Sequence, residues 1–245
     1  TIMKKIFSLL LVLTVFLNIQ AQFKSPYKLN LATDITLPVV SLGMIGTAFL
    51  LEKKRPGLTV DQINGLDRNT ISVFDRNATH NWNTTAAKWS DGLMISTGVL
   101  PLLFLIDERS RKDFGKVAMI YSEIFLVNVA LTNLTKELVQ RKRPYVYNPN
   151  VPLHEKMDKD ATHSFFSGHV SLTAAMAFGF AQMYQDYFPN SPAKAGVWFG
   201  AAVLPLAVAI LRNRAGKHFW TDVLVGYAVG AAVGILIPRL HKVKK

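Results

Sequence analysis

Residues 114–144 read FGKVAMIYSEIFLVNVALTNLTKELVQRKRP, and this stretch is the strongest indication of how the chain is built. An apolar run, Phe114–Leu134, leads directly into Lys136, and Arg143 follows at the end of the stretch. A helix of about 20 apolar residues is long enough to cross a hydrocarbon core of about 30 Å. The stretch therefore predicts a membrane-spanning helix that ends in basic side chains at one membrane surface.

The same alternation of apolar and charged segments recurs along the rest of the chain. Several apolar segments are nearer to about 15 than to about 20 residues, so adjacent amphipathic residues must extend them if they cross a membrane. The pattern predicts an all-α, membrane-embedded bundle of about six helices. A water-soluble helical bundle with a very apolar core is the alternative. The six predicted segments are Ile35–Leu51, Leu93–Ile106, Phe114–Leu134, Val170–Tyr184, Val197–Leu211 and Val223–Ile237.

The last of these segments carries a glycine at every fourth position, at Gly226, Gly230 and Gly234. Residues four apart lie on one face of a helix, and small residues on such a face allow two helices to approach closely in lipid. We therefore expect this helix to pack tightly against a neighbour inside a membrane.

Composition narrows the possible partners. The chain has 245 residues, half of them hydrophobic, with a formal net charge of +12 and a mean hydropathy of +0.21. Its basic residues lie between apolar runs and not along one polar helix, which favours phosphate-bearing lipid head groups over nucleic acid as the partner. The absence of cysteine excludes a disulfide, a thiolate zinc site and a cysteine nucleophile.

The N-terminus is typical of a secretion signal. Lys4 and Lys5 precede an apolar run, Ile6–Ile19, and Ala21 is a plausible residue before cleavage. An uncleaved anchor helix is the alternative.

The sequence divides into three predicted parts. Trp82 and Trp89 lie in a polar stretch, where tryptophan commonly anchors a chain at the membrane interface. The parts are a signal peptide or anchor (1–22), an N-terminal helix with an interfacial loop (23–89) and a helical core (90–245).

Lys136 and Arg143 form the first of three polar motifs. They are seven residues apart, close to two helical turns, so we expect both cations on one helix face, with Pro144 ending the helix. A compact ammonium and a planar guanidinium both suit phosphate oxygens. Cations at a helix C-terminus also simply complement the helix dipole, which is the alternative interpretation.

The second motif is Ser167-Gly168-His169, directly before an apolar helix. Ser167 can cap that helix, and Gly168 lets the backbone N–H groups approach an anion closely. His169 is then placed to protonate a leaving oxygen. A plain cap followed by a histidine is the alternative.

The third motif contains Arg212, His218 and Asp222. His218 and Asp222 are four residues apart and neighbours on a helix face, and a carboxylate beside an imidazole fixes its tautomer, as a nucleophilic histidine requires. Arg212 adds positive charge for phosphate oxygens, and a structural His–Asp pair is the alternative. We expect the nearby Arg214 and Lys217 to be solvated or lipid-facing.

Together the motifs resemble the type 2 phosphatidic acid phosphatase superfamily, whose patterns are K-x6-R-P, P-S-G-H and S-R-x5-H-x3-D. Members include membrane lipid phosphatases, class A acid phosphatases and vanadium haloperoxidases. Two positions depart from the patterns, because Phe166 replaces a proline and Leu211 replaces a serine. Neither departure removes a catalytic group.

The resemblance implies a role for each motif residue. His218 is the implied nucleophile that forms a phosphohistidine, Asp222 orients it, and His169 is the general acid. The implied site has no metal and no cofactor. The implied phosphate-binding residues are Lys136, Arg143, Ser167, Gly168 and Arg212. We expect no comparable partners for the other histidines, His80, His154, His163 and His241.

The predicted function is hydrolysis of a membrane lipid phosphate or diphosphate. Phosphatidic acid, phosphatidylglycerophosphate, undecaprenyl diphosphate and lipid A phosphates are all candidate substrates. The alternatives are a periplasmic acid phosphatase, a vanadate-dependent haloperoxidase and a non-catalytic lipid-binding membrane protein.

The distribution of charge bears on sidedness. The basic tail, residues 239–245, favours the cytoplasm, which places His218 on the periplasmic face of a bacterial inner membrane. A signal before Ile35–Leu51 conflicts with that orientation if every segment crosses. We therefore expect Ile35–Leu51 to lie in the interface without crossing fully.

Overall fold

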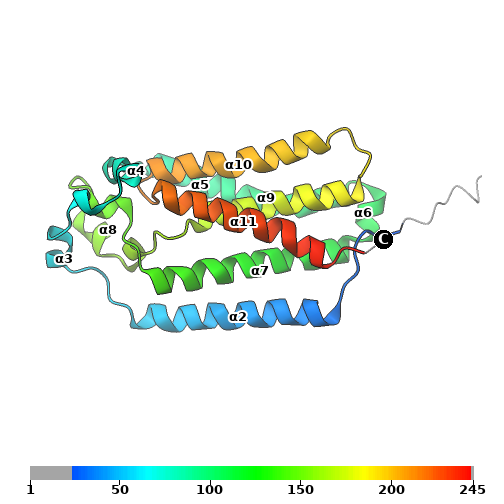
Figure 1. Ribbon diagram of the computed structural model, residues 1–245, viewed down its shortest axis with the longest axis horizontal. Coiled ribbons are helices and arrows are strands. Elements are labelled where there is room, and N and C mark those ends of the chain that lie inside the picture. Colours follow the sequence, from blue (N-terminus) through cyan, green and yellow to red (C-terminus); the bar gives the residue numbers. More distant parts are fainter. Residues whose placement is uncertain (1–23, 244–245) are drawn as a thin grey trace, which may run out of the picture.

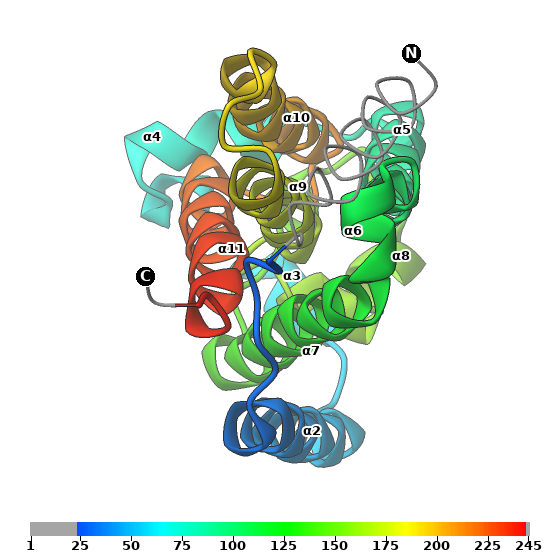
Figure 2. The same ribbon diagram turned by 90° about the vertical axis from the view of Figure 1, so that its right-hand side faces the viewer.

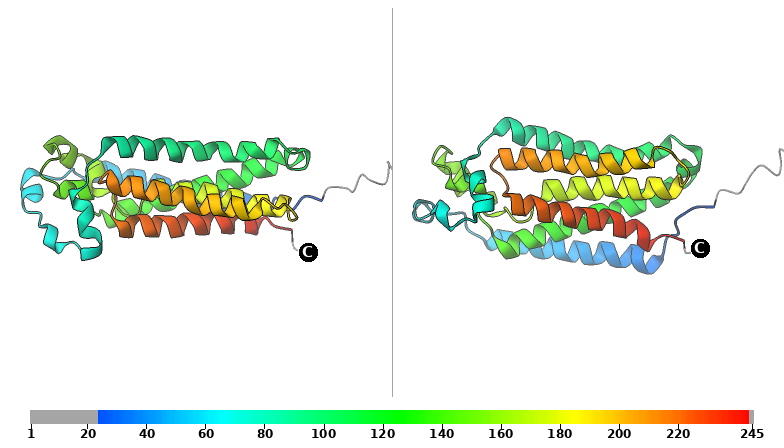
Figure 3. Two further views of the ribbon diagram at one scale, coloured as in Figure 1. Left: turned by 90° about the horizontal axis from the view of Figure 1, so that it is seen from above. Right: turned by 45° about the horizontal axis from the view of Figure 1, so that its top comes forward.

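The computed structural model describes residues 24–243, and its regular elements are helices. Six long helical segments lie side by side along one axis (Figures 1 and 3). They cover the six predicted segments, apart from Ile106 at the end of the second, and each helical segment is longer than predicted, so the predicted all-α bundle is confirmed. They are α2 (Leu31–Lys54), α5 (Thr84–Ser96) continued by η3 (Thr97–Leu105), α7 (Phe114–Val139), α9 (Gly168–Tyr187), α10 (Lys194–Arg214) and α11 (Trp220–Leu240).

Short helices gather mainly at one end of the bundle, on the left in Figure 1. There they link the long helices and cover their ends. The short elements of this end are α3 (Val60–Asn64), η1 (Arg68–Thr70), α4 (Val73–Arg76), η2 (Asn77–His80), η4 (Pro144–Tyr147), α8 (Leu153–Met157) and η5 (Lys159–Thr162). At the opposite end α6 (Glu108–Lys112) precedes α7.

Four helices of the described chain are long and apolar enough to cross a membrane: α2, α7 with its continuation to Tyr147, α10 and α11. Helix α9 is the most enclosed, with α5, α7, α10 and α11 around it (Figure 2). The interfacial placement expected for Ile35–Leu51 stays a prediction, and α2 is long and apolar enough to cross a membrane. Helix α2 runs alongside α7 over the length of the bundle, and its 24 residues correspond to about 36 Å.

The glycine pattern of α11 packs against α9, as predicted. An added Cβ would lie 2.6 Å from the Ser167 carbonyl oxygen at Gly226, 2.0 Å from that of Ser171 at Gly230 and 2.3 Å from that of Ala175 at Gly234. Any side chain at these positions would force the two backbones apart. This close approach keeps the start of α11 beside the start of α9, where two of the predicted motifs lie.

Both ends of the described chain meet at the end of the bundle opposite the short helices. Tyr27 pairs with Lys242 in an isolated antiparallel bridge, and the Lys28 N–H donates to the His241 carbonyl at 2.9 Å. The Tyr27 hydroxyl also donates to Asp186 at 2.8 Å. The predicted signal segment lies outside the described residues.

The polar stretch before residue 90 packs onto the ends of the long helices. Asn81 Nδ2 donates to the Asn213 carbonyl at 3.0 Å, and Arg68 donates to the Tyr147 carbonyl through two nitrogens. The Trp82 ring lies 5.3 Å from that of Tyr145, so Trp82 is part of this packing. The predicted boundary at residue 90 remains a prediction.

Candidate active site

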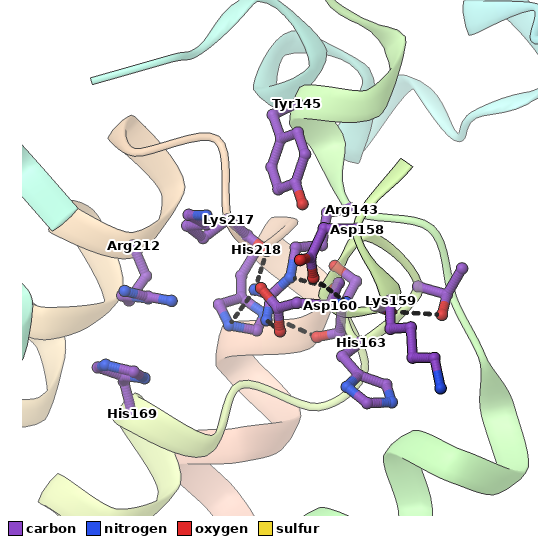
Figure 4. A network of polar contacts seen from close by, with 12 residues as sticks. Arg143, Tyr145, Asp158, Lys159, Asp160, His163, His169, Arg212, Lys217 and His218 are labelled. Carbon is purple, nitrogen blue, oxygen red and sulfur yellow. Dashed lines mark hydrogen bonds and ion pairs between the residues drawn. The ribbon is translucent and has the colours of Figure 1, made fainter. Parts of the chain in front are cut away.

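The three predicted motifs converge at the end of the bundle that carries the short helices. They come from the end of α7, the start of α9, the end of α10 and the start of α11. A cavity of about 400 Å³ opens there, and its lining includes His169, Arg212, Asp160 and Lys217. Figure 4 shows His169 and Arg212 on one side of this space, facing His218 and Arg143 on the other.

His218 is held in a defined orientation and is 1 % exposed. Its Nδ1–H donates to the Ser164 carbonyl at 2.6 Å. The lone pair is therefore on Nε2, which accepts from Arg143 Nη1 at 3.2 Å. Burial lowers the pKa of His218 well below its usual value, and the nearby Arg143 and Arg212 lower it further. The ring is thus a neutral imidazole with one lone pair directed at the cationic side of the site.

Asp222 supports His218 without bonding to it directly. Its Oδ2 lies 4.0 Å from His218 Nδ1, beyond hydrogen-bond distance, in place of the direct i, i+4 contact that we expected. Asp222 accepts instead from Ser164 Oγ at 2.5 Å and from the Phe219 N–H at 2.9 Å. Ser164 therefore links the two residues, because its hydroxyl binds Asp222 while its carbonyl binds His218.

Arg143 reaches the site from a loop and not from a helix face. Helix α7 ends at Val139, where Gln140 takes the left-handed conformation at φ 49°. The prediction that Lys136 and Arg143 share one helix face is therefore wrong, because the helix ends four residues before Arg143. Its place is set by hydrogen bonds to the Asp160 carbonyl at 2.8 Å, Asp160 Oδ1 at 2.6 Å and the Lys217 carbonyl at 2.8 Å.

Asp160 is an anion within the cationic cluster, and its carboxylate pairs with Arg143. Burial alone would raise the pKa of the Asp160 carboxyl, but Arg143 outweighs burial and holds that pKa well below its usual value. The carboxylate stays charged and keeps Arg143 in place.

The start of α9 is arranged as a site for an anion. Ser167 makes no capping hydrogen bond, contrary to expectation, and its buried hydroxyl has no partner within the described residues. An added Cβ at Gly168 would lie 2.8 Å from Thr132 Cγ2 and 3.7 Å from Lys136 Nζ, so only glycine leaves this space open. The unpartnered hydroxyl, the lysine ammonium and the first N–H groups of α9 thus lie close together.

His169 and Arg212 share a carboxylate that the motifs do not include. His169 Nε2 lies 2.7 Å from Asp91 Oδ1, so this nitrogen carries the proton, and Arg212 Nη1 lies 3.3 Å from the same oxygen. Asp91 is on α5 and its side chain is 48 % exposed. Nothing in the sequence around Asp91 marks it, because its two partners are far away along the chain.

Lys217 lines the cavity, which corrects the expectation that it is solvated or lipid-facing. Its ammonium lies 4.7 Å from the centre of the Tyr145 ring and 5.5 Å from that of Trp82. The aromatic faces stabilise the cation and hold it at the mouth of the cavity.

Two further charged residues, Arg141 and Asp75, hold Asp222 in place, and neither is among the predicted site residues. Arg141 bonds Asp222 through Nη1 and Asp75 Oδ2 through Nη2, the latter at 2.9 Å. Asp75 is 1 % exposed and also accepts from the Thr221 N–H at 3.0 Å. The position of Arg141 between Lys136 and Arg143 could have identified it as a site residue. Asp75 lies in the polar stretch before residue 90, where no sequence motif points to it.

Two histidines outside the motifs have carboxylate partners, which corrects a second expectation. His163 Nε2 lies 2.6 Å from Glu137 Oε1, and Arg55 Nε donates to the other oxygen of Glu137 at 3.1 Å. His241 Nε2 lies 2.6 Å from Glu123 Oε2 at the far end of the bundle. Arg55 thereby ties the end of α2 to the end of α7 beside the site.

Residues 117–245 match the family model described as the PAP2 superfamily. Phosphatidylglycerophosphatase B of Bacillus subtilis (strain 168) is 31 % identical over 156 residues, which span 61 % of this chain and 71 % of that protein.

A solved structure is also similar. It is the transmembrane PAP2 type phosphatidylglycerolphosphate phosphatase from Bacillus subtilis, with a TM-score of 0.52 and 19 % sequence identity. The match covers 82 % of this chain and 94 % of that chain. At this identity the likeness supports the fold alone.

Proposed function

This chain belongs to the PAP2 superfamily and is a membrane-embedded phosphatase, and we propose that it hydrolyses a lipid phosphate through a phosphohistidine formed on His218. One observation carries the mechanism. A neutral imidazole lone pair is directed into a cluster of cationic side chains from separate parts of the chain. Such a cluster suits a group with several negative oxygens, and electrostatic stabilisation is the main catalytic term expected for phosphoryl transfer.

In the first step His218 Nε2 attacks phosphorus, and the bond from phosphorus to the lipid oxygen breaks. His169 enters the step as an imidazolium beside Asp91, gives one ring proton to that leaving oxygen and becomes neutral. Arg143 leaves its contact with Nε2 and binds the phosphate oxygens, together with Lys136, Arg212, Ser167 and the N–H of Gly168.

In the second step His169, now neutral, takes a proton from water. The water oxygen attacks phosphorus, the bond from phosphorus to Nε2 breaks, and inorganic phosphate leaves. Asp222 acts throughout by holding Ser164, which fixes the proton on His218 Nδ1. Fixed cations replace a metal in this scheme, so we propose that catalysis is metal-independent and blocked by vanadate.

Phosphatidylglycerophosphate is the first substrate to test, because the curated relative is named for that activity. Phosphatidic acid, undecaprenyl diphosphate and lipid A phosphates share the same phosphate chemistry and complete the panel. Candidate membrane-spanning helices favour these lipids over the soluble esters of a periplasmic acid phosphatase or the halides of a haloperoxidase.

The test is phosphate release from this panel by the purified full chain. We expect release from at least one lipid, none from His218→Ala, and trapping of labelled phosphoenzyme by acid quench in the wild type. His169→Ala should still form phosphoenzyme from substrates with good leaving groups. His154→Ala, at a solvent-exposed histidine near the site, is the matched control. Full activity in His218→Ala would exclude the assigned nucleophile.

We further propose that the site faces the periplasm across the inner membrane. If the long axis of the bundle crosses the membrane, both described chain ends lie on the side opposite the site, and the basic tail favours the cytoplasm there. Single cysteines in this cysteine-free chain test this. A membrane-impermeant thiol reagent on spheroplasts should label His154→Cys and not Lys112→Cys, both at well-exposed side chains. The reverse labelling would place the site in the cytoplasm.

A further inference from the structure

A second buried group of titratable side chains lies at the end of the bundle opposite the phosphatase site. It consists of Asp34 in the first turn of α2, Glu123 in α7 and His241 directly after α11. The three residues are 89 and 118 positions apart (34 to 123, and 123 to 241), so no sequence motif joins them. They meet where both ends of the described chain come together, on the right in Figure 1.

The side chains converge on one point. His241 Nε2 lies 2.6 Å from Glu123 Oε2, and His241 Nδ1 lies 3.4 Å from Asp34 Oδ1. One oxygen from each carboxylate and one ring nitrogen all lie within 4.8 Å of one another. Ligands about 2.1 Å from a metal lie up to about 4.2 Å apart, so side-chain adjustments of several tenths of an ångström would close the set around an ion.

The group is buried and incompletely satisfied. The side chains of Glu123 and His241 are 0 % exposed and that of Asp34 is 13 % exposed. Three of their buried atoms have no hydrogen-bond partner within residues 24–243: Asp34 Oδ1, Glu123 Oε1 and His241 Nδ1. Buried carboxylate oxygens without donors are costly, and two such carboxylates around one imidazole indicate that positive charge belongs between them.

Protein cations do not supply that charge in the described part of the chain. His241 is the one basic residue there within ion-pair distance of Asp34 or Glu123, and the nearby Lys242 is paired with Asp186. A single imidazole, even when protonated, leaves one of two carboxylate charges uncompensated. A divalent cation neutralises both.

We propose that Asp34, Glu123 and His241 bind one divalent transition-metal ion. The donor set of two carboxylates and one imidazole favours ions such as Zn²⁺ or Mn²⁺ over Mg²⁺ and Ca²⁺, which prefer oxygen ligands alone. The ion would tie together α2, α7 and the residue after α11. Asp34 lies outside residues 117–245, so the site joins the part of the chain that matches the family model to a helix that does not.

The role of the ion is structural, because the cluster and the phosphate cavity lie at opposite ends of the bundle. Metal binding therefore stabilises the fold without entering the chemistry at His218. This separates the proposal from the proposed function, since either can fail while the other holds.

The test uses the purified full chain in detergent, freed of metal by chelation and dialysis. Titration with Zn²⁺, and with Mn²⁺ followed by electron paramagnetic resonance, should show one ion per chain. We expect Glu123→Gln and His241→Ala to bind at least about 100-fold more weakly, because each loses a ligand. Zn²⁺ should raise the melting temperature of the wild type by several degrees and leave that of both variants unchanged.

Two controls keep the result specific. Glu108→Gln removes an exposed carboxylate at the same end of the bundle and should bind as the wild type does. If Glu123→Gln does not fold, Asp34→Asn replaces it, because Asp34 is the least buried ligand. Binding that is equal in the wild type and the ligand variants would overturn the proposal.

Absence of binding in the wild type would also overturn it. A third result would overturn it as well: a melting temperature that does not change with metal but falls as the pH rises through the pKa of His241. The hydrogen bond to Glu123 raises that pKa. In that case a protonated imidazole, and not a metal, holds the two carboxylates.

Discussion

The two ends of the bundle each bury carboxylates beside a histidine, and they satisfy them in opposite ways. At the phosphatase end Asp222 receives hydrogen bonds from Ser164, Arg141 and a backbone N–H, so the carboxylate is fully occupied. At the far end the cluster of Asp34, Glu123 and His241 retains three atoms that have no hydrogen-bond partner among residues 24–243. The comparison teaches that a buried carboxylate with a complete set of hydrogen-bond donors positions the residues around it. A buried carboxylate without such donors indicates a missing ligand.

The sharpest test of the phosphatase end is removal of the proposed nucleophile. His218→Ala should reduce kcat by about 10³-fold or more, because no neighbouring side chain offers a lone pair in the same position. Asp222→Asn should reduce it by about 100-fold, because Arg141 and Ser164 lose a charged acceptor. Steady-state assays on the preferred lipid measure both. Neither change should alter metal binding at the far end, and a lost ion in His218→Ala would mean that the two ends are coupled.

A smaller effect is expected from Asp75, which binds Asp222 only through Arg141. Asp75→Asn should lower kcat by about 10-fold with little change in KM, because Asp75 acts through Arg141 and does not touch phosphate. Asp61→Asn, at an exposed position of the same polar stretch, is the matched control. An increase in KM with unchanged kcat would instead place Asp75 in substrate binding.

The pH dependence of the reaction tests the charge state of His218. The proposed nucleophile must be neutral, and because burial and neighbouring cations lower the pKa of His218, it remains neutral at more acidic pH than an ordinary histidine. The acid limb of kcat/KM, corrected for ionisation of the substrate phosphate, should therefore have its midpoint below about 6.5. A midpoint above that value would contradict the described surroundings of His218.

A chelator should have the smallest effect on turnover. It tests the two ends in one sample, because turnover depends on the phosphatase end and metal-dependent stability on the far end. Initial rates measured well below the melting temperature should change by less than about twofold, because the phosphate-binding cations are side chains. The melting temperature should fall by several degrees in the same sample. Loss of turnover in a folded sample, restored by Mg²⁺, would show that catalysis itself needs a metal.

The difference between the ends also explains what the sequence could predict. The long helices were predictable because apolar length is a local signal, and the glycines of α11 even indicated a close neighbour. The motif residues were predictable because each motif is short. Asp91, Asp75 and the far cluster were not, because each acts through partners many residues away. The predicted end of α7 was wrong because Gln140 adopts a left-handed conformation, which is uncommon for glutamine and cannot be predicted from its residue type.

Beside the bridge between Tyr27 and Lys242, the cluster of Asp34, Glu123 and His241 forms from residues that are synthesised at different times. Asp34 and Glu123 precede His241 in the sequence, Glu123 by 118 residues, so both acids leave the ribosome before it does. Until then two acids that are buried in the finished bundle lack their imidazole partner. A chain truncated before residue 241 would retain every motif of the phosphatase site and still expose this defect. Burial of these two acids with their imidazole therefore depends on a residue that follows every motif of the phosphatase site.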